Sequence, residues 1–181
     1  MRIIAGSRKG ARIAAPKGAA TRPTGDRVRE AAFNLIGPVD DALVLDLYAG
    51  SGAMGLEALS RGARRCVFVE SDRAACRVIQ ANLEKLRLTG AVVRCRDAVA
   101  ALRQERSAGT RYDLLLVDPP YSDYASSLQM TLSDLLPAVL APDGLVVLET
   151  ATKTEPELAL EPVTSRRYGS ARLTLFRAAA T

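Results

Sequence analysis

The chain has 181 residues, of which 48% are hydrophobic and 25% charged, a composition typical of one globular domain with a packed core. It contains no histidine, which excludes Ser-His and Cys-His nucleophile schemes and removes the commonest general base and zinc ligand. The net charge of +5 is concentrated in residues 1–36, where eight basic side chains face two acidic ones and favour a polyanionic partner.

The three cysteines fit a reducing compartment. Cys66, Cys76 and Cys95 are odd in number and widely spaced, so they form neither a disulfide framework nor a metal-binding pair. No apolar run reaches the length of a membrane span, and the first residues lack the layout of a signal peptide. We therefore expect a cytoplasmic protein with no bound metal and no membrane association.

Residues 1–38 are predicted to form a basic extension made of a hairpin and a helix. Two short apolar segments, Ile3-Ile4 and residues 13–15, flank a basic turn, and a helix is expected over residues 27–36. The side chains expected to contact phosphate groups are Arg2, Arg8, Lys9, Arg12, Lys17 and Arg22.

Residues 39–181 are predicted to form an α/β domain. Short apolar runs predict strands at residues 43–45, 66–69, 91–93, 112–117 and 145–148. Helices are expected between them, at residues 53–60, 74–87, 98–105 and 128–139. Strands without polar alternation, separated by helices, are typical of a mainly parallel sheet that is covered on both faces.

The end of the chain departs from this alternation. Residues 163–168 and 171–176 flank Gly169-Ser170, which predicts an antiparallel hairpin that closes the sheet. Residues 150–162 are rich in Thr, Lys, Glu and Pro, so we expect a connector there.

A glycine-rich loop follows the first predicted strand. Gly50 and Gly52 let the backbone turn tightly and approach a ligand closely. Glu70 ends the second strand, where a carboxylate can take both ribose hydroxyls of a nucleoside, and Asp97 follows the third strand, where it could meet an adenine amino group. The carboxyl ends of parallel strands form the binding edge of open α/β sheets, so these residues predict a nucleoside site.

Two cofactors fit this loop. Gly50, Gly52 and Gly55, with an acid 20 residues after Gly50, match the dinucleotide fingerprint and leave an NAD-dependent oxidoreductase as an alternative. Asp46 lies four residues before Gly50, where a carboxylate repels a pyrophosphate but attracts the ammonium and sulfonium of S-adenosylmethionine. Asp46 therefore favours S-adenosylmethionine, with S-adenosylhomocysteine as the product.

The strand at residues 112–117 ends in the motif Asp118-Pro119-Pro120-Tyr121. Proline fixes φ, so the carbonyl groups of Asp118 and Pro119 are held in place. These acceptors and the Tyr121 ring suit an exocyclic amine on a flat base, because they accept its N–H groups and provide a stacking surface. The predicted catalytic residues are Asp118, Pro119, Pro120 and Tyr121.

The motifs resemble two nested groups of enzymes. Asp46-x-x-x-Gly50-x-Gly52 with Glu70, Asp97 and the Asp-Pro-Pro-Tyr motif is similar to class I S-adenosylmethionine-dependent amino-methyltransferases. The segments at residues 2–6, 16–18, 22–34, 46–52 and 168–173 resemble the RsmD family of bacterial 16S rRNA guanine-N2 methyltransferases. The resemblance covers nearly the whole chain, with departures at Ala5 and at residues 158–161.

The resemblance implies a seven-stranded Rossmann-like methyltransferase sheet and one methyl group placed on N2 of a guanine in 16S rRNA. It also implies action on the small ribosomal subunit or its assembly intermediate, with the basic extension binding the RNA. The expected cofactor-binding residues are Thr24, Asp46, Tyr48, Gly50, Gly52, Glu70, Asp97 and Ala98. We expect a monomer, because no helix shows a sustained heptad pattern.

Three other functions remain open from the sequence. A methyltransferase for adenine N6 of DNA, or for another RNA, would use the same Asp-Pro-Pro-Tyr motif, since the two amines are alike in geometry. An NAD-dependent oxidoreductase would use the glycine loop and give Asp118 no role. A non-catalytic RNA-binding factor that keeps the fold is the third alternative.

Overall fold

The protein is described by a computed structural model that covers residues 1–16, 25–120, 124 and 126–178. Its helical elements are η1 (Gly6–Arg8), α1 (Asp26–Ile36), α2 (Ala53–Ser60), α3 (Arg73–Leu86), α4 (Ala98–Ser107) and α5 (Ser126–Val139). Its strands are β1 (Leu43–Leu47), β2 (Arg65–Glu70), β3 (Ala91–Cys95), β4 (Tyr112–Val117), β5 (Leu140–Ala151), β6 (Glu161–Tyr168) and β7 (Ala171–Arg177). Within these described ranges, no helix is long and apolar enough to cross a membrane.

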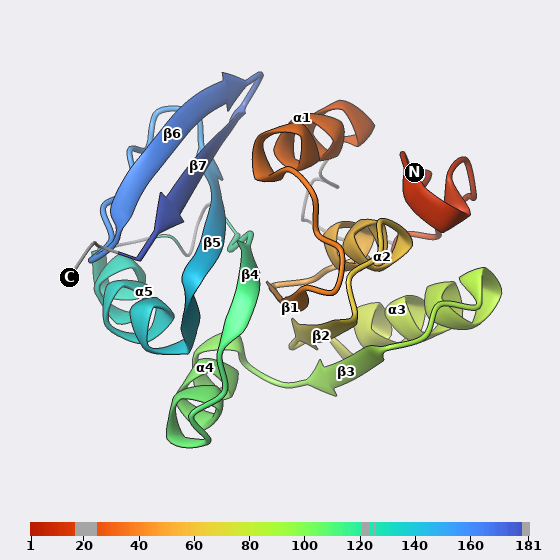
Figure 1. Ribbon diagram of the computed structural model, residues 1–181, viewed down its shortest axis with the longest axis horizontal. Coiled ribbons are helices and arrows are strands. Elements are labelled where there is room, and N and C mark those ends of the chain that lie inside the picture. The colour runs from red at the N-terminus through yellow and green to blue at the C-terminus, as the bar shows by residue number, and fades with distance from the viewer. Residues whose placement is uncertain (17–24, 121–123, 125, 179–181) are drawn as a thin grey trace.

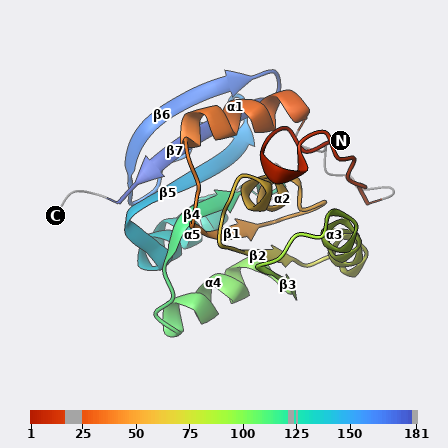
Figure 2. The same cartoon turned by 45° about the vertical axis from the view of Figure 1, so that its right-hand side comes forward.

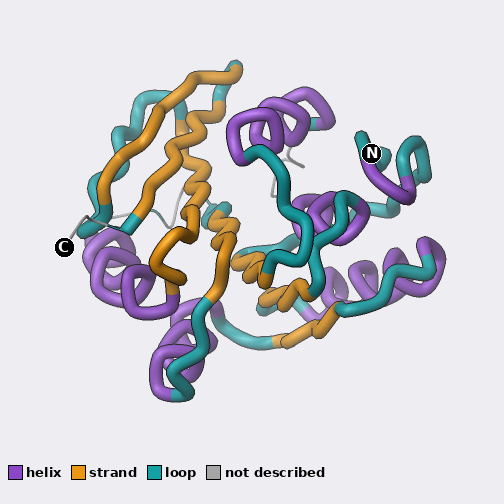
Figure 3. Tube along the Cα trace, in the orientation of Figure 1, coloured by secondary structure: helices purple, strands orange, loops and turns teal. Residues whose placement is uncertain are grey.

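The strands form one seven-stranded sheet in the order β3-β2-β1-β4-β5-β7-β6 (Figure 1). The first five of these strands are parallel, and β7 pairs antiparallel with both β5 and β6. Figure 3 shows the strands in orange and the helices around them in purple. This confirms the expected Rossmann-like α/β sheet with a C-terminal antiparallel hairpin. Because the chain moves outward from β1 to β3 and then returns to β4, the order reverses between β1 and β4, where such sheets bind their ligands.

Helices cover both faces of the sheet (Figure 2). The N-terminal segment, α1, α2 and α3 pack on one face, and α4 and α5 pack on the other. Side chains alternate between the two layers, so Val44 and Phe68 pack under α2 while Leu45 and Val67 face the opposite layer. Burial on both faces explains the unbroken apolar runs of the strands.

Residues 1–16 are folded against the rest of the protein. Arg2 and Arg12 form an antiparallel bridge, and η1 occupies the turn between them. Ile3 and Ile13 are buried in the same hydrophobic layer as Phe33 of α1. The hairpin-like extension and α1 therefore share a core with the sheet, and the division at residue 38 stays a prediction.

A buried carboxylate in α2 fastens this N-terminal segment. The Glu57 side chain is fully buried and accepts the backbone N–H groups of Ile4 at 2.8 Å and Ala5 at 2.9 Å. It also accepts a hydrogen bond from Arg61 at 2.8 Å and forms an ion pair with the buried Arg29, 3.6 Å from Nε of Arg29. One side chain thus connects the extension, α1 and α2.

The largest departures from the predicted boundaries concern β5 and the connector that follows it. Strand β5 begins at Leu140 rather than at residue 145, because the pairing with β4 shifts register between Tyr112 and Leu114 and accommodates the Pro142 to Gly144 segment. The expected connector at 150–162 is shorter, since β5 continues to Ala151 and β6 begins at Glu161. Proline and glycine occur in irregular strands as well as in loops, so the sequence pattern does not reveal that β5 is longer than residues 145–148.

We expect Glu57→Gln to destabilise the protein by about 3–5 kcal/mol, because a neutral amide leaves the buried Arg29 with the partly exposed Asp26, 2.9 Å away, as its only counter-charge among the described residues. Urea denaturation measures this change in the free energy of unfolding. Glu84→Gln, at an exposed position on α3, is the matched control and should change it by less than about 0.5 kcal/mol. Equal effects of the two substitutions would show that the Glu57 carboxylate does not hold the N-terminal segment.

Candidate active site

The residues predicted to bind a cofactor follow consecutive strands at one edge of the sheet. The glycine loop follows β1, Glu70 ends β2, Asp97 follows β3 and Asp118 follows β4. All four strands are parallel, so these carboxyl ends lie together on the edge where the strand order reverses. The Asp118 N–H also contacts the carbonyl oxygen of Leu47 at 3.4 Å, which joins the β4 motif to the end of β1.

Glu70 holds the glycine loop in place. One carboxylate oxygen accepts the backbone N–H of Gly50 at 2.8 Å, and the other accepts the backbone N–H of Asp72 at 2.8 Å. The Ala49 N–H donates to the carbonyl oxygen of Val69, so backbone and side chain of this strand end both contact the loop. The predicted pair of Gly50 and Glu70 is thus brought into direct contact.

The glycines of the loop have different roles. Gly50 has a φ of 56°, and a Cβ there would meet only the carbonyl oxygen of Tyr48, at 3.9 Å, so its surroundings are open. Gly52 has a φ of 76° and precedes the first residue of α2. Gly55 is a packing glycine, because a Cβ would lie 2.3 Å from the ring of Phe68. Gly50 therefore remains the loop position where a ligand can approach the backbone.

Tyr48 has an unusual backbone conformation for its residue type. Its φ is 59°, a region that glycine favours and that other residues enter at a cost of about 1–3 kcal/mol. Conformations of this kind persist where the surrounding structure fixes them, and they cluster at ligand sites. No sequence pattern signals this strain, although Tyr48 is one of the expected cofactor-binding residues.

Asp46 lies beneath the loop rather than in it. Its side chain is buried in β1 and accepts the backbone N–H of Gly55 at 2.9 Å, which fixes the start of α2. Burial raises the pKa of Asp46 to about 8; the hydrogen bond from Gly55 opposes this rise and the nearby Glu70 charge adds to it. A buried acid of this kind would be stabilised in its charged form by a cation bound beside it.

Asp97 and Ala98 form the start of α4. The Asp97 side chain caps this helix by accepting the Ala100 N–H at 2.8 Å, and Ala98 is buried in the layer beneath α4. Capping explains an acid at this position without a ligand. The contact of Asp97 with an adenine amine stays a prediction.

The Asp118 motif is described only in part. Pro119 is buried, and the carbonyl oxygen of Pro120 accepts the Tyr124 N–H at 3.2 Å. Tyr121 lies outside the described residues, as does Thr24. Asp118, Pro119 and Pro120 stand beside the end of β1, as the motif requires.

Tyr124 is a residue near this motif that the sequence reading missed. Its hydroxyl group is buried without a hydrogen-bond partner in the described part of the chain, and burial raises the pKa of Tyr124 to about 12. Its ring packs against the layer that contains Val117 and Leu47. The available signal was a second tyrosine three residues after Tyr121.

The basic extension presents some of its cations and uses others in the fold. Arg2, Lys9 and Arg12 are exposed. Arg8 is half-buried and donates hydrogen bonds to the carbonyl groups of Leu86 and Arg87 at the end of α3. Arginine at a helix C-terminus satisfies carbonyl groups that have no partner within the helix. The fold thus gives Arg8 a structural contact, and its contact with phosphate stays a prediction.

Two of the expected phosphate contacts, Lys17 and Arg22, lie outside the described residues. Among residues that are described, no group of three or more acidic or cysteine side chains is arranged to hold a metal ion.

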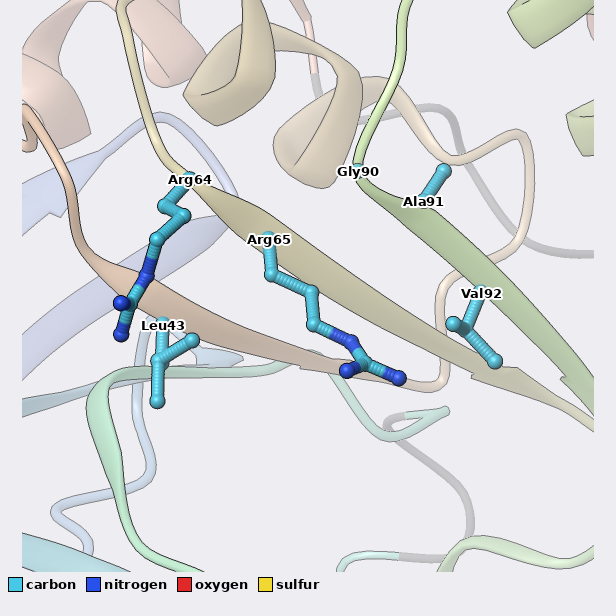
Figure 4. Close-up of a pocket in the computed structure, with 6 residues that line it drawn as sticks. All are labelled: Leu43, Arg64, Arg65, Gly90, Ala91 and Val92. Atoms are coloured by element: carbon cyan, nitrogen blue, oxygen red, sulfur yellow. The ribbon is translucent and has the colours of Figure 1, made fainter.

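Two surface cavities lie at the opposite edge of the sheet. The larger, of about 550 Å³, is lined by the amino-terminal ends of β1 to β3. Figure 4 shows the Arg64 side chain ending beside Leu43 and the Arg65 side chain extending towards Val92. The smaller, of about 370 Å³, is lined by four aspartates: Asp40, Asp41, Asp113 and Asp143. Neither cavity contains a residue of the glycine loop or of the Asp118 motif.

The chain is similar to known proteins over most of its length. The family model described as Conserved hypothetical protein 95 matches residues 1–177. YlbH of Bacillus subtilis, named as a candidate rRNA methyltransferase, is 40% identical over 98% of both chains. The ribosomal RNA small subunit methyltransferase D of Escherichia coli K12 is 43% identical over 122 residues, which are 67% of this chain and 60% of that protein.

The fold is also similar to that of a solved structure. The protein yhhF of Escherichia coli, named as a candidate methyltransferase, has a TM-score of 0.84 and 33% identity to this chain. The match covers 100% of this chain and 99% of that structure.

We expect the stability of the protein to fall with rising pH because of Asp46. The folded state keeps a proton on this acid up to about pH 8, whereas the unfolded state loses it near pH 4, so stability declines through that window by at most about 1.4 kcal/mol per pH unit. Asp46→Asn removes this decline. Urea denaturation between about pH 5 and pH 8 measures it.

Asp143→Asn, at an exposed position, is the control and should leave the pH dependence of wild type intact. An Asp46→Asn profile parallel to that of wild type would show that this acid is charged in the folded protein.

Proposed function

Because the chain belongs to the RsmD family of rRNA methyltransferases, we propose that it transfers a methyl group from S-adenosylmethionine to N2 of one guanine in 16S rRNA. One observation carries this proposal: the Gly50–Glu70 contact and the Asp118 motif lie at the same edge of the sheet, next to the end of β1. The glycine loop and Glu70 suit a nucleoside cofactor, and the Asp118 motif suits an exocyclic amine. Methyl transfer between the two requires the two sites to be adjacent.

The residues present fit S-adenosylmethionine, which supplies a methyl group already activated on a sulfonium. The open surroundings of Gly50 leave room for a ligand against the loop, and we assign the neighbouring Glu70 to its ribose hydroxyls. Asp46 gives the site a buried acid whose charged form favours a cationic ligand over a pyrophosphate. We assign Asp97 to the adenine amine and Thr24, which lies outside the described residues, to the methionine end.

Asp118 and Pro119 bind and orient the nucleophile, the N2 amine of guanine. The lone pair of guanine N2 is delocalised into the ring, so the amine is a poor nucleophile. The Asp118 side chain and the Pro119 carbonyl accept its two hydrogens, which draws the nitrogen towards tetrahedral geometry and aligns its lone pair with the methyl group. Positioning of this kind can supply on the order of 7–11 kcal/mol, so the chemistry proceeds without a histidine.

Proton loss follows the transfer, with Asp118 or water as the acceptor. Tyr121 stacks on the target base once it is swung out of its surroundings. Pro120 fixes the turn between the acceptor groups and this ring.

The RNA is bound through the basic extension. Arg2, Lys9 and Arg12 are exposed on it and suit phosphate contacts, which position an RNA without reading its sequence. We place the substrate in the small ribosomal subunit or its assembly intermediate and the enzyme in the cytoplasm, as a monomer. Three free cysteines support a reducing compartment.

The alternatives lack comparable support. The named relatives are methyltransferases rather than oxidoreductases, which argues against a dinucleotide cofactor. A non-catalytic RNA-binding factor does not require Asp118 next to the glycine loop, so this alternative does not explain the arrangement. Methylation of DNA adenine remains distinguishable by the identity of the product.

The test is methyl transfer from labelled S-adenosylmethionine to unmethylated small subunits, with naked rRNA and duplex DNA in parallel. We expect N2-methylguanosine from the subunits, identified by mass spectrometry. Asp118→Ala should lower kcat roughly 100-fold or more, because it removes an acceptor used in the transition state. Asp113→Ala, on an exposed residue at the other end of β4, should retain activity. Methyladenine in DNA, or full activity of Asp118→Ala, would overturn the proposal.

Lys9→Gln tests the RNA surface. Lys9 is exposed with no side-chain partner among the described residues, so its substitution leaves the fold intact. We expect a higher KM for the subunit, an unchanged cofactor affinity, and a salt dependence of log KM whose slope is lower by about 1. Lys153→Gln, exposed in the β5–β6 connector, is the control. Matching effects of the two substitutions would exclude a specific contact at Lys9.

A further inference from the structure

Two thiol groups flank the loop that carries Glu70. Cys95 is the last residue of β3 and pairs in register with Glu70 of β2. The Cys76 thiol, in the first turn of α3, donates to the carbonyl oxygen of Glu70 at 3.3 Å, and Sγ of Cys95 lies 3.8 Å from the carbonyl oxygen of Ser71. The two thiols therefore contact consecutive carbonyl groups in the loop between β2 and α3. Cys95 is also near enough to raise the pKa of Cys76.

The environments of the two thiols differ. Cys95 is exposed, whereas the Cys76 residue is only 5% exposed. Burial, followed by the hydrogen bond to Cys95, raises the pKa of Cys76 to about 12, which keeps it a neutral thiol. The third cysteine, Cys66, is buried under α2, where a Cβ on Gly55 would lie 2.6 Å from its sulfur. Cys95 is thus the thiol that a dissolved oxidant meets first.

We propose that Cys76 and Cys95 are an oxidisable pair whose disulfide weakens cofactor binding at the adjacent site. A peroxide oxidises the Cys95 thiol to a sulfenic acid and is itself reduced to water. The Cys76 sulfur then attacks the Cys95 sulfur, the S–O bond breaks, and the oxygen leaves as a second water with the Cys76 proton. Two thiols and one hydrogen peroxide give one disulfide and two waters. A dithiol reductant reverses the reaction.

The disulfide affects cofactor binding through Glu70. A disulfide draws the two sulfur atoms to about 2.05 Å and removes both thiol contacts with the Glu70 and Ser71 carbonyl groups. The Glu70 carboxylate holds the Gly50 and Asp72 N–H groups, so a shift of this loop moves the glycine loop as well. The effect on cofactor affinity rests on the proposed function, whereas formation of the bond does not.

The test compares the reduced, peroxide-treated and re-reduced forms of the full chain. Peptide mapping by mass spectrometry should find a Cys76–Cys95 link and an unmodified Cys66 in the oxidised form. Calorimetry should then show S-adenosylmethionine binding weakened by about tenfold and restored by a dithiol, which is within the usual coupling range of linked sites. Cys95→Ser and Cys76→Ala should each bind the cofactor as reduced wild type does, before and after peroxide.

Each outcome bears on one claim. A link to Cys66, a link between two chains, or no link at all would overturn the assignment of the pair. A Cys76–Cys95 disulfide with unchanged cofactor affinity would overturn the coupling. If the reduced wild type fails to bind S-adenosylmethionine, the proposed function fails instead, while the mapping still decides whether the pair forms.

Discussion

The fold depends on the cost of burying one carboxylate. Glu57 is removed from water inside α2, and a charge in such a place is tolerated only when donors surround it. Hydrogen bonds come from the Ile4 and Ala5 backbone and from Arg61 after α2, and Arg29 of α1 adds a positive charge 3.6 Å away. Satisfying this group therefore fixes where the basic extension and α1 lie on the sheet. Because α2 begins just after the glycine loop, the same helix ties the extension to the cofactor edge.

The acidic residues of the candidate site already have partners in the protein. Glu70 holds the glycine loop, Asp97 caps α4, and Asp46 fixes the start of α2. These bonds use one oxygen atom of Asp46, one of Asp97 and both of Glu70. Each carboxylate oxygen has two lone pairs, so the three acids keep acceptor capacity for a ligand. A site built this way is shaped before the ligand arrives, which lowers the ordering cost of binding. It also means that removing one of these acids changes the loop as well as the ligand contacts.

The sequence predicts the sheet well because its signals are local. Unbroken apolar runs such as residues 112–117 exist only where both faces of a strand are covered, and parallel strands place their carboxyl ends together. Interactions across long sequence separations are not visible in such patterns. The Glu57–Arg29 pair, the docking of Arg8 at Leu86 and the buried hydroxyl of Tyr124 all belong to this second kind. The early start of β5 is hidden for a different reason, since Pro142 and Gly144 are typical of a loop although they lie in an irregular strand.

The docking of Arg8 on the end of α3 has a consequence for the order of folding. Its partner, Leu86, lies 78 residues later in the chain, so this segment reaches its binding position only after two strands and three helices have been synthesised. Closing so long a loop adds little entropy cost, since that cost grows only with the logarithm of length. During translation, however, the nascent extension is a cationic strand with its isoleucines uncovered, and its native placement is a late event in the assembly of the domain.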